Sequence, residues 1–396
     1  MEKKSIHKHL HYFSKHPSRG LKELYWSVGL MDLGVAAVTI FEPIFLFTLG
    51  YSLKEIMFFY LLVYLVYTLI LPLFGKVVAH FGYEHSILYS QFFLIAFYVS
   101  LFAISSIPVF FYIAPLFLAI QKALYWPSYH ADFTIFSNDE QRGRELSGIE
   151  TLSMIVYVIG PLAGGFILVW SNFSTLFIIA SALFLLSAIP LLRIKEIHSK
   201  QKFQYKDVFK HLIDKDHRRN FIAFLGFGEE LIVLTVWPIF IYTLIQNYAS
   251  IGEIVAGATL ITGGVVLLIG KISDKYGQMK LLRLGSAIYF ISWIFRAFAS
   301  KGWHILSLDT TSRFSKEMVF LPIESMTYSA AKKLGPLSHG IFYEQSTAIA
   351  KVFAASLAII VIYYFVDPWM PIFCLAAGFS LLYLFYKKSN PKNGPN

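Results

Sequence analysis

Residues 42–49 read Glu-Pro-Ile-Phe-Leu-Phe-Thr-Leu, and residues 237–244 read Trp-Pro-Ile-Phe-Ile-Tyr-Thr-Leu. The second stretch follows the first by 195 residues, which is about half of the 396-residue chain. Two further matches share this offset: Gly75, Lys76 and Gly82 match Gly270, Lys271 and Gly277, and Pro127 matches Pro322. Three matches at one offset indicate that the chain consists of two repeated halves.

The composition indicates that both halves lie in a membrane. The chain is 56% hydrophobic and only 15% charged, whereas about a quarter of the residues of a soluble domain are charged. Apolar stretches of about twenty residues, the length that crosses a bilayer as a helix, recur throughout. We expect about twelve spanning helices, at residues 25–49, 53–74, 85–104, 108–133, 145–170, 173–193, 220–246, 251–270, 279–299, 304–330, 339–363 and 368–386.

These spans predict an all-α polytopic protein made of two pseudo-symmetric six-helix bundles. We place the N-terminal bundle at 25–193 and the C-terminal bundle at 220–386, joined by a cytoplasmic linker at 194–219, with tails at 1–24 and 387–396. Cys374 is the single cysteine, so neither an internal disulfide nor a Cys-rich metal site can form. We expect no cofactor, no metal and a monomeric protein.

The basic residues predict the orientation of the chain. Of 34 Lys and Arg, 27 fall in the tails and in the loops on the side of the tails, and five lie within spans. The opposite loops contain only Lys54 and Lys301. Because Lys and Arg concentrate on the cytoplasmic side, we expect both termini in the cytoplasm of a prokaryote and the spans in its plasma membrane. The net charge of +10 is then explained by this topology and by attraction to anionic lipid. We therefore expect no nucleic-acid binding.

The loop between the second and third spans of each half has a recognisable pattern. Gly270, Asp274 and Gly277 are followed by Lys280, and in the first half Gly75 and Gly82 are kept. The spacing Gly-x-x-x-Asp-x-x-Gly with basic residues resembles the loop motif of the major facilitator superfamily, and the resemblance covers nearly the whole chain. In the first copy Ala79 stands where the family has Asp.

The resemblance implies a secondary transporter with a central polar cavity that opens alternately to the two sides of the membrane. It also places Asp274 near Arg142 and Arg144, where the three would latch the cytoplasmic side. Residues Gly160, Pro161, Gly164 and Gly165 resemble the end of a motif associated with exporters. Small residues at this spacing also allow close helix packing, so both interpretations stay open.

Fourteen ionisable residues lie within the predicted spans, and such residues mark functional sites by default because burying a charge in lipid is costly. Ten are on the first, fourth, seventh and tenth spans, which line the cavity in the family. The fourteen are Asp32, Glu42, Lys122, Glu150, Glu229, Glu230, Arg296, Asp309, Arg313, Lys316, Glu317, Glu324, Glu344 and Lys351. Nine are acids and five are bases, so surplus carboxylates are expected to hold protons or bind cations.

The tenth span carries a stripe of charge. Asp309, Arg313 and Glu317 are spaced four apart and can pair along one helix face, and with Lys122, Lys316 and Lys351 they form an expected charge network in the cavity. Asp32, Glu42, Glu229 and Glu230 have no basic residue in their own spans. We therefore expect them to carry the coupled proton, with Glu229 or Glu230 first. We assign Arg296, which is near a span end, to the membrane interface.

Aromatic residues suggest the substrate. Tyr125, Trp126 and Tyr129 surround Pro127, and Trp237 precedes Pro238. Such faces suit apolar or cationic guests, although they can also be packing residues. We favour proton-coupled export of a small amphipathic or cationic compound. The alternatives are uptake of a sugar, an organic acid or a metal ion, and a non-transporting membrane sensor or scaffold with the same fold.

The topology is testable with single cysteines in a Cys374→Ala background. An impermeant thiol reagent applied to intact cells should label cysteines at Lys54 and Lys301, which we expect outside. It should not label cysteines at the expected cytoplasmic positions, which are Asn138, Lys206 and Lys332. Labelling at Lys206 from outside would refute the orientation with both ends in the cytoplasm.

Overall fold

A computed structural model describes residues 19–136, 142–192, 215–334 and 336–387 of the chain. The predictions for Asn138 and Lys206 fall outside these residues. All regular structure in the described part is helical, so the all-α prediction is confirmed.

The N-terminal half contains α1 (Arg19–Val38), α2 (Phe41–Thr48), α3 (Leu53–Phe81), α4 (Tyr83–Ala103), α5 (Phe110–Phe136), α6 (Arg142–Trp170) and α7 (Phe173–Leu191). The C-terminal half contains α9 (Lys215–Phe224), η1 (Leu225–Phe227), α10 (Gly228–Ile245), α11 (Tyr248–Tyr276), α12 (Gln278–Arg296), α13 (Gly302–Leu334), α14 (Pro336–Tyr364), α15 (Trp369–Leu382) and η2 (Tyr383–Phe385). Every predicted span falls on one helix or on a short run of helices.

The first and seventh spans are interrupted, at places that the repeat did not predict. The first span is interrupted between α1 and α2. The break lies four residues before Pro43, which has no backbone N–H to donate. In the seventh span the matching Pro238 lies inside α10, and the irregular turn η1 comes earlier, between Phe224 and Gly228. The repeated sequence therefore does not produce the same helix break in the two halves.

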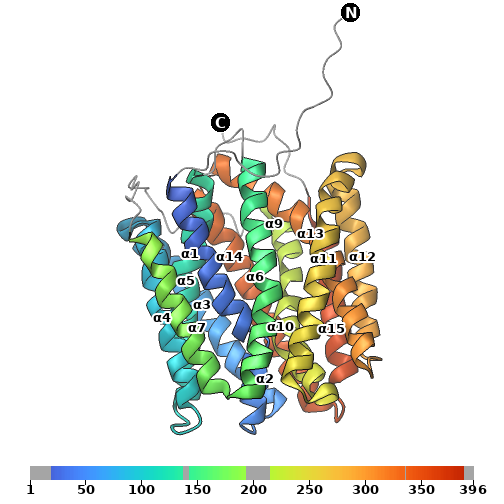
Figure 1. Cartoon of the computed structure of the whole chain (residues 1–396). Coiled ribbons are helices and arrows are strands. Elements are labelled where there is room, and N and C mark those ends of the chain that lie inside the picture. Colours follow the sequence, from blue (N-terminus) through green and yellow to red (C-terminus); the bar gives the residue numbers. More distant parts are fainter. Residues whose placement is uncertain (1–18, 137–141, 193–214, 335, 388–396) are drawn as a thin grey trace, which may run out of the picture.

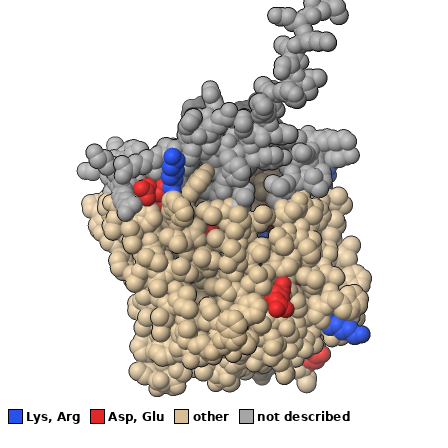
Figure 2. All heavy atoms as spheres, viewed as in Figure 1, with Lys and Arg blue, Asp and Glu red and all other residues tan. Residues whose placement is uncertain are grey.

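The helices stand side by side with nearly parallel axes (Figure 1). Among the described residues, eight helices are long and apolar enough to cross a membrane. The charged helix α13 is not one of them, yet it packs against α11 and α12 within the same helix bundle. Figure 2 shows a flank formed almost entirely by uncharged side chains, as contact with lipid requires.

Two contacts between the halves follow the symmetry of the repeat. Helix α3 lies against α14, and α6 lies against α11. The offset of 195 residues exchanges α3 with α11 and α6 with α14, so one contact is the symmetry mate of the other. The turns at the ends of α3 and α11 also match, since Gly82 has φ 92° and Gly277 has φ 87°. Only glycine adopts this backbone region without strain.

The small residues of α6 allow two close helix contacts. A Cβ atom on Gly164 would lie 2.1 Å from the carbonyl oxygen of Ala37 in α1. On the contact with α11, a Cβ on Gly165 would lie 2.5 Å from the carbonyl oxygen of Tyr248, and a Cβ on Gly252 would lie 2.3 Å from that of Pro161. Gly160 likewise abuts α1, with its virtual Cβ 2.5 Å from the Cβ of Ala36. These residues therefore set the approach of α6 to α1 and α11.

The α6–α11 contact can be tested with two alanines on one helix. Gly252→Ala places a methyl group against backbone, so we expect the free energy of unfolding to fall by about 1–3 kcal/mol. Gly264→Ala is the control, because a Cβ there meets nothing within 4 Å. Since alanine is the better helix former, this control should be neutral or stabilising by up to about 1 kcal/mol. Thermal unfolding in nanodiscs measures both, and equal midpoints for the two variants would contradict this account of the packing.

Candidate functional site

Most of the charged side chains that the sequence predicted within spans lie between helices and are not exposed on the flank. In the C-terminal half they form two clusters, one around Glu229 and one around Asp309. In the N-terminal half, Asp32 and Glu42 contact hydroxyl groups. For Arg142, Arg144, Glu150, Gly270 and Asp274 the structure describes only the helical backbone, so the predicted cytoplasmic latch stays a prediction.

The Glu229 cluster joins α10, α13 and α14. Lys316 of α13 contacts both acids of α10, Glu229 and Glu230, and its Nζ is 3.2 Å from the Oε1 of Glu230. Lys351 of α14 lies 3.0 Å from the other carboxylate oxygen of Glu230. Two acids are therefore matched by two bases. Tyr289 and Tyr383 also donate hydrogen bonds to the carboxylate of Glu229, whose side chain is fully buried.

These contacts bear on the order of the proton-coupling candidates. The sequence placed Glu229 and Glu230 first because their own span contains no base. Their bases come from α13 and α14, at positions 87 and 121 residues away in the chain. A carboxylate that is paired with a lysine is stabilised in its charged form, so the reason for placing these two acids first does not hold in the folded protein.

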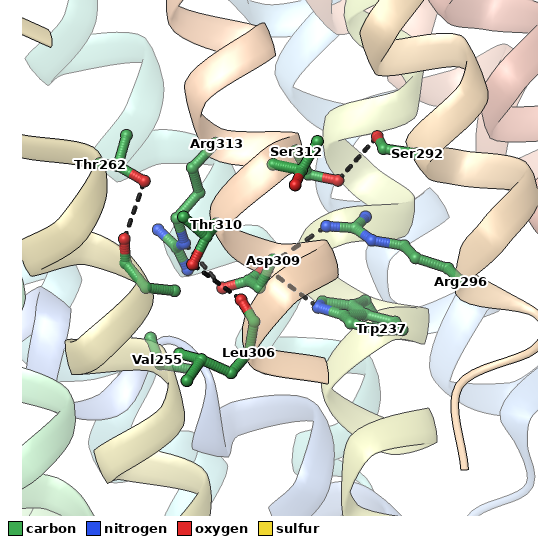
Figure 3. Close-up of polar contacts among 12 residues, drawn as sticks. Trp237, Val255, Thr262, Ser292, Arg296, Leu306, Asp309, Thr310, Ser312 and Arg313 are labelled. Carbon is green, nitrogen blue, oxygen red and sulfur yellow. Dashed lines mark hydrogen bonds and ion pairs between the residues drawn. The ribbon is translucent and has the colours of Figure 1, made fainter. Parts of the chain in front are cut away.

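The Asp309 cluster is shown in Figure 3. Arg313, one turn along α13, donates from Nε to Oδ2 of Asp309 at 2.7 Å, so the predicted pair between these residues is present. The other oxygen, Oδ1, accepts from the indole nitrogen of Trp237 at 3.2 Å and lies 3.3 Å from Nη2 of Arg296. Among the described residues no ion pair joins Arg313 to Glu317, although the sequence allowed one.

The position of Arg296 in this cluster differs from the prediction. We expected it at the membrane interface, but it is 1% exposed. Its guanidinium lies 4.4 Å from the ring centroid of Trp237 and 4.1 Å from that of Trp293. The interface assignment is wrong because Asp309 and two aromatic faces supply a partner inside the bundle. The aromatic residues Trp237, Trp293 and Tyr289 at matching depth were the available signal in the sequence.

Glu42 is the acid with the simplest surroundings. It lies in the first turn of α2, just after the helix break, and is 8% exposed. Tyr98 of α4 donates to one carboxylate oxygen, and the hydroxyl of Tyr60 of α3 lies 3.4 Å from the other. Within the described part of the chain no base forms an ion pair with Glu42. Asp32 of α1 accepts a hydrogen bond from the hydroxyl of Ser153 at 2.8 Å.

The predicted aromatic residues separate into two environments. Tyr125 and Tyr129 stack with ring centroids 5.7 Å apart, and Trp126 and Tyr129 are partly exposed. Trp237, in contrast, is buried and donates a hydrogen bond to Asp309, so it belongs to the charge cluster. Lys122 lies 5.7 Å from the ring centroid of Tyr64.

A polar contact between the halves was missed by the sequence analysis. Glu344 of α14 is 8% exposed. It accepts a hydrogen bond from Tyr67 of α3 at 2.8 Å and lies 3.2 Å from Nε2 of His130 of α5. Next to it, Gln345 donates to the carbonyl oxygen of Thr68 at 2.9 Å. These contacts tie α14 of one half to α3 and α5 of the other.

A second set of contacts between the halves closes the end of the helix bundle at α2. Tyr242 of α10 and Tyr248 of α11 stack at 5.6 Å between ring centroids. They meet Phe47, Phe41 and Phe173 of the N-terminal half edge to face. The charge clusters therefore lie between two sets of contacts, and each set links the two halves.

Two cavities lie away from these clusters. One of about 670 Å³ is at the α2 end, between α3, α5 and α14, and is lined mainly by aromatic side chains. One of about 600 Å³ adjoins Arg219 and Arg283. Both are open, and neither contains the residues described above. No three His, Cys, Asp or Glu side chains gather as a metal site among the described residues.

The Glu344 contact predicts a measurable shift between conformations. Tyr67→Phe removes a hydrogen bond to a buried carboxylate, so it should weaken the closure between α3 and α14 by about 1.5–3 kcal/mol. A cysteine at Thr347, in a Cys374→Ala background, should then react with N-ethylmaleimide roughly tenfold faster or more. Tyr363→Phe, at an exposed tyrosine on the same helix, is the control. Equal reaction rates in Tyr67→Phe and the control would show that the contact does not hold the halves together.

Comparisons with known proteins agree with this architecture. The family described as Major Facilitator Superfamily matches residues 24–331. The nucleoside transporter NupG has a similar structure, with a TM-score of 0.65 and 15% sequence identity, over 93% of this chain and 98% of that one. FucP, a transporter of the same superfamily in the outward conformation, has a TM-score of 0.65 and 14% identity, over 92% of this chain and 96% of that one.

At these identities the two structures show a common fold, and no curated protein matches the chain in sequence. The family match, however, covers more than half of the chain. It agrees with the loop pattern, the repeated halves and the buried charges between them. The chain belongs to the Major Facilitator Superfamily, and it is a membrane transporter rather than an enzyme.

Proposed function

We propose that this transporter is a proton-coupled secondary carrier that works by alternating access, with Glu42 as the principal proton-carrying residue. The observation that carries the proposal is the environment of Glu42. It is a nearly buried carboxylate held by two tyrosine hydroxyls. Burying a charged carboxylate that forms no ion pair is expensive, so such a group suits a site that gains and loses a proton during transport.

The other three candidates have supporting roles in this proposal. Asp32 lies on the same span as Glu42 and also accepts from a hydroxyl, so it is the second proton site. Glu229 and Glu230 share two lysines, and all four residues belong to the C-terminal half. Because these ion pairs join α10 to α13 and α14, the charge state of the two acids affects how the helices of the C-terminal half pack.

Alternating access is supported by the two sets of contacts between the halves. One set is the aromatic contacts at the α2 end, and the other is the Glu344 contacts farther along the bundle. Both sets have to be present in a form that is closed at both ends. Opening either end breaks only one set. Since α3–α14 and α6–α11 are related by the repeat, the halves can rock about a central site, as in transporters built from parallel repeats.

The direction of transport rests on less specific observations. The small residues from Gly160 to Gly165 suggest export, but all of their observed contacts are helix packing. The partly exposed Trp126 and Tyr129 suit an amphipathic compound. A sensor or scaffold with this fold would not need a buried proton site, so a substrate-induced proton flux distinguishes it from a carrier.

Coupling can be tested in proteoliposomes that contain a pH-sensitive dye. Substrates for this assay are compounds that raise the unfolding midpoint of the purified protein in a screen at acidic and neutral pH. Glu42→Gln should abolish pH-gradient-driven transport but leave substrate exchange at equal pH largely intact. Tyr98→Phe should give an intermediate effect.

Glu253→Gln is the matched control, because Glu253 is an exposed acid on α11. It should leave gradient-driven transport unchanged. Gradient-driven transport of normal rate in Glu42→Gln would remove Glu42 from the coupling mechanism.

A further inference from the structure

We propose that the substrate carries an anionic oxygen group, a carboxylate or a phosphate, and that Arg313 binds this group. The proposal deepens the proposed transport function, on which it rests, by naming the chemical class of the substrate. It replaces the cationic compound expected from the aromatic residues with an amphipathic anion. It follows from the distribution of charge around Asp309 (Figure 3).

Asp309 is one carboxylate shared by two guanidinium groups. Arg313 contacts its Oδ2 and Arg296 contacts its Oδ1, so the cluster has a net charge of +1. In the neighbouring cluster, Lys316 and Lys351 are matched by Glu229 and Glu230. The positive charge that is not compensated within either cluster is therefore at the Asp309 site.

Arg296 already meets the need of Asp309 for a cation. It is buried on α12 between two indole rings and cannot reach solvent. The indole N–H of Trp237 adds a second donor to the same oxygen. Asp309 would thus remain paired and hydrogen-bonded without Arg313, so neutralising Asp309 does not by itself explain the second arginine.

Arg313 is placed differently from Arg296. Its side chain is 35% exposed and extends toward α11, where Thr262 lies (Figure 3). It is anchored through Nε alone. Among the described residues, the two terminal nitrogens of Arg313 have no hydrogen-bond or ion-pair partner. These nitrogens form the planar fork that binds carboxylate and phosphate groups through two parallel hydrogen bonds.

Asp309 acts as a positioning residue in this arrangement. A guanidinium held at Nε cannot rotate freely, so its fork is oriented before an anion arrives. Such preorganisation reduces the entropy lost on binding. The alternative explanation is that Arg313 is only part of a structural ion-pair ladder, in which case removing it should affect stability but not the choice of ligand.

Binding of compounds with one skeleton and different head groups separates these explanations. The full-length protein in nanodiscs is titrated with 3-phenylpropionate, 3-phenylpropanamide and 3-phenylpropylamine at constant ionic strength. Butyrate, butyramide and butylamine repeat the comparison on an aliphatic skeleton, and phenyl phosphate with phenol tests the phosphate. The readout is the midpoint of thermal unfolding, which rises with ligand occupancy.

We expect a carboxylate or the phosphate to bind at least about tenfold more tightly than its neutral match, as a charge-assisted pair allows. Arg313→Gln should abolish this preference and keep an unliganded midpoint near that of the wild type, because Arg296 still pairs with Asp309. Arg313→Lys keeps the charge but loses the fork, so it should bind the carboxylate roughly tenfold more weakly than the wild type. Lys54→Gln, at an exposed lysine outside the cluster, should retain the full preference.

Two results would overturn the proposal. One is equal binding of anions and their neutral matches by the wild type on every skeleton. The other is a preference for anions that persists in Arg313→Gln or, if that variant does not fold, undiminished in Arg313→Lys. Because binding is measured without a pH gradient, this outcome is independent of the coupling experiment with Glu42→Gln. A protein that prefers anions but shows no proton-driven flux would contradict only the coupling.

Discussion

Charges buried between the helices of this protein must find partners within the protein, because lipid offers none and water reaches few of them. This requirement organises the interior more than any other constraint. Asp309 is satisfied by two arginines and an indole, Glu229 by a lysine and two tyrosines, and Glu344 by a tyrosine and a histidine from the opposite half. Each partner comes from another helix or from the next turn, so satisfying the charges also fixes how the helices pack.

The same requirement gives the two halves different roles. The C-terminal half contains ion-pair clusters that join α10, α12, α13 and α14. In the N-terminal half, hydroxyl groups contact Glu42 and Asp32. Hydroxyl groups can serve a carboxylate whether or not it is protonated, whereas a lysine favours the charged form. The proposed division of labour, with proton binding in one half and substrate binding in the other, follows from this difference.

A bound anion and a bound proton would also balance one another. In symport of a proton and a carboxylate, the empty carrier has a charged Glu42 and an unoccupied Arg313, and the loaded carrier has a neutral Glu42 and a neutralised Arg313. The net charge of the site is then the same in both states. Since moving uncompensated charge within a membrane is costly, this equality would allow the loaded and the empty protein to change conformation at similar cost.

Much of the architecture could be predicted from the sequence. Each of the twelve predicted spans lies on helix, because about twenty apolar residues in lipid have to satisfy their backbone groups internally. The repeat predicted the related turns at Gly82 and Gly277, which have nearly the same φ. The pair of Asp309 and Arg313 was predictable because residues four apart on a helix are neighbours.

Partners that lie far apart in the sequence were decided only by the tertiary structure. Nothing in the sequence near Glu229 indicates Lys316, and nothing near Glu344 indicates Tyr67, which is 277 residues away. Arg296 was misplaced for the same reason, because the sequence contains the two tryptophans but does not show that their rings and Asp309 surround its guanidinium. Periodicity and composition act within one helix and determine which residues are helical and buried. Which buried charge meets which partner depends on how the helices pack against one another, and only the tertiary structure shows this.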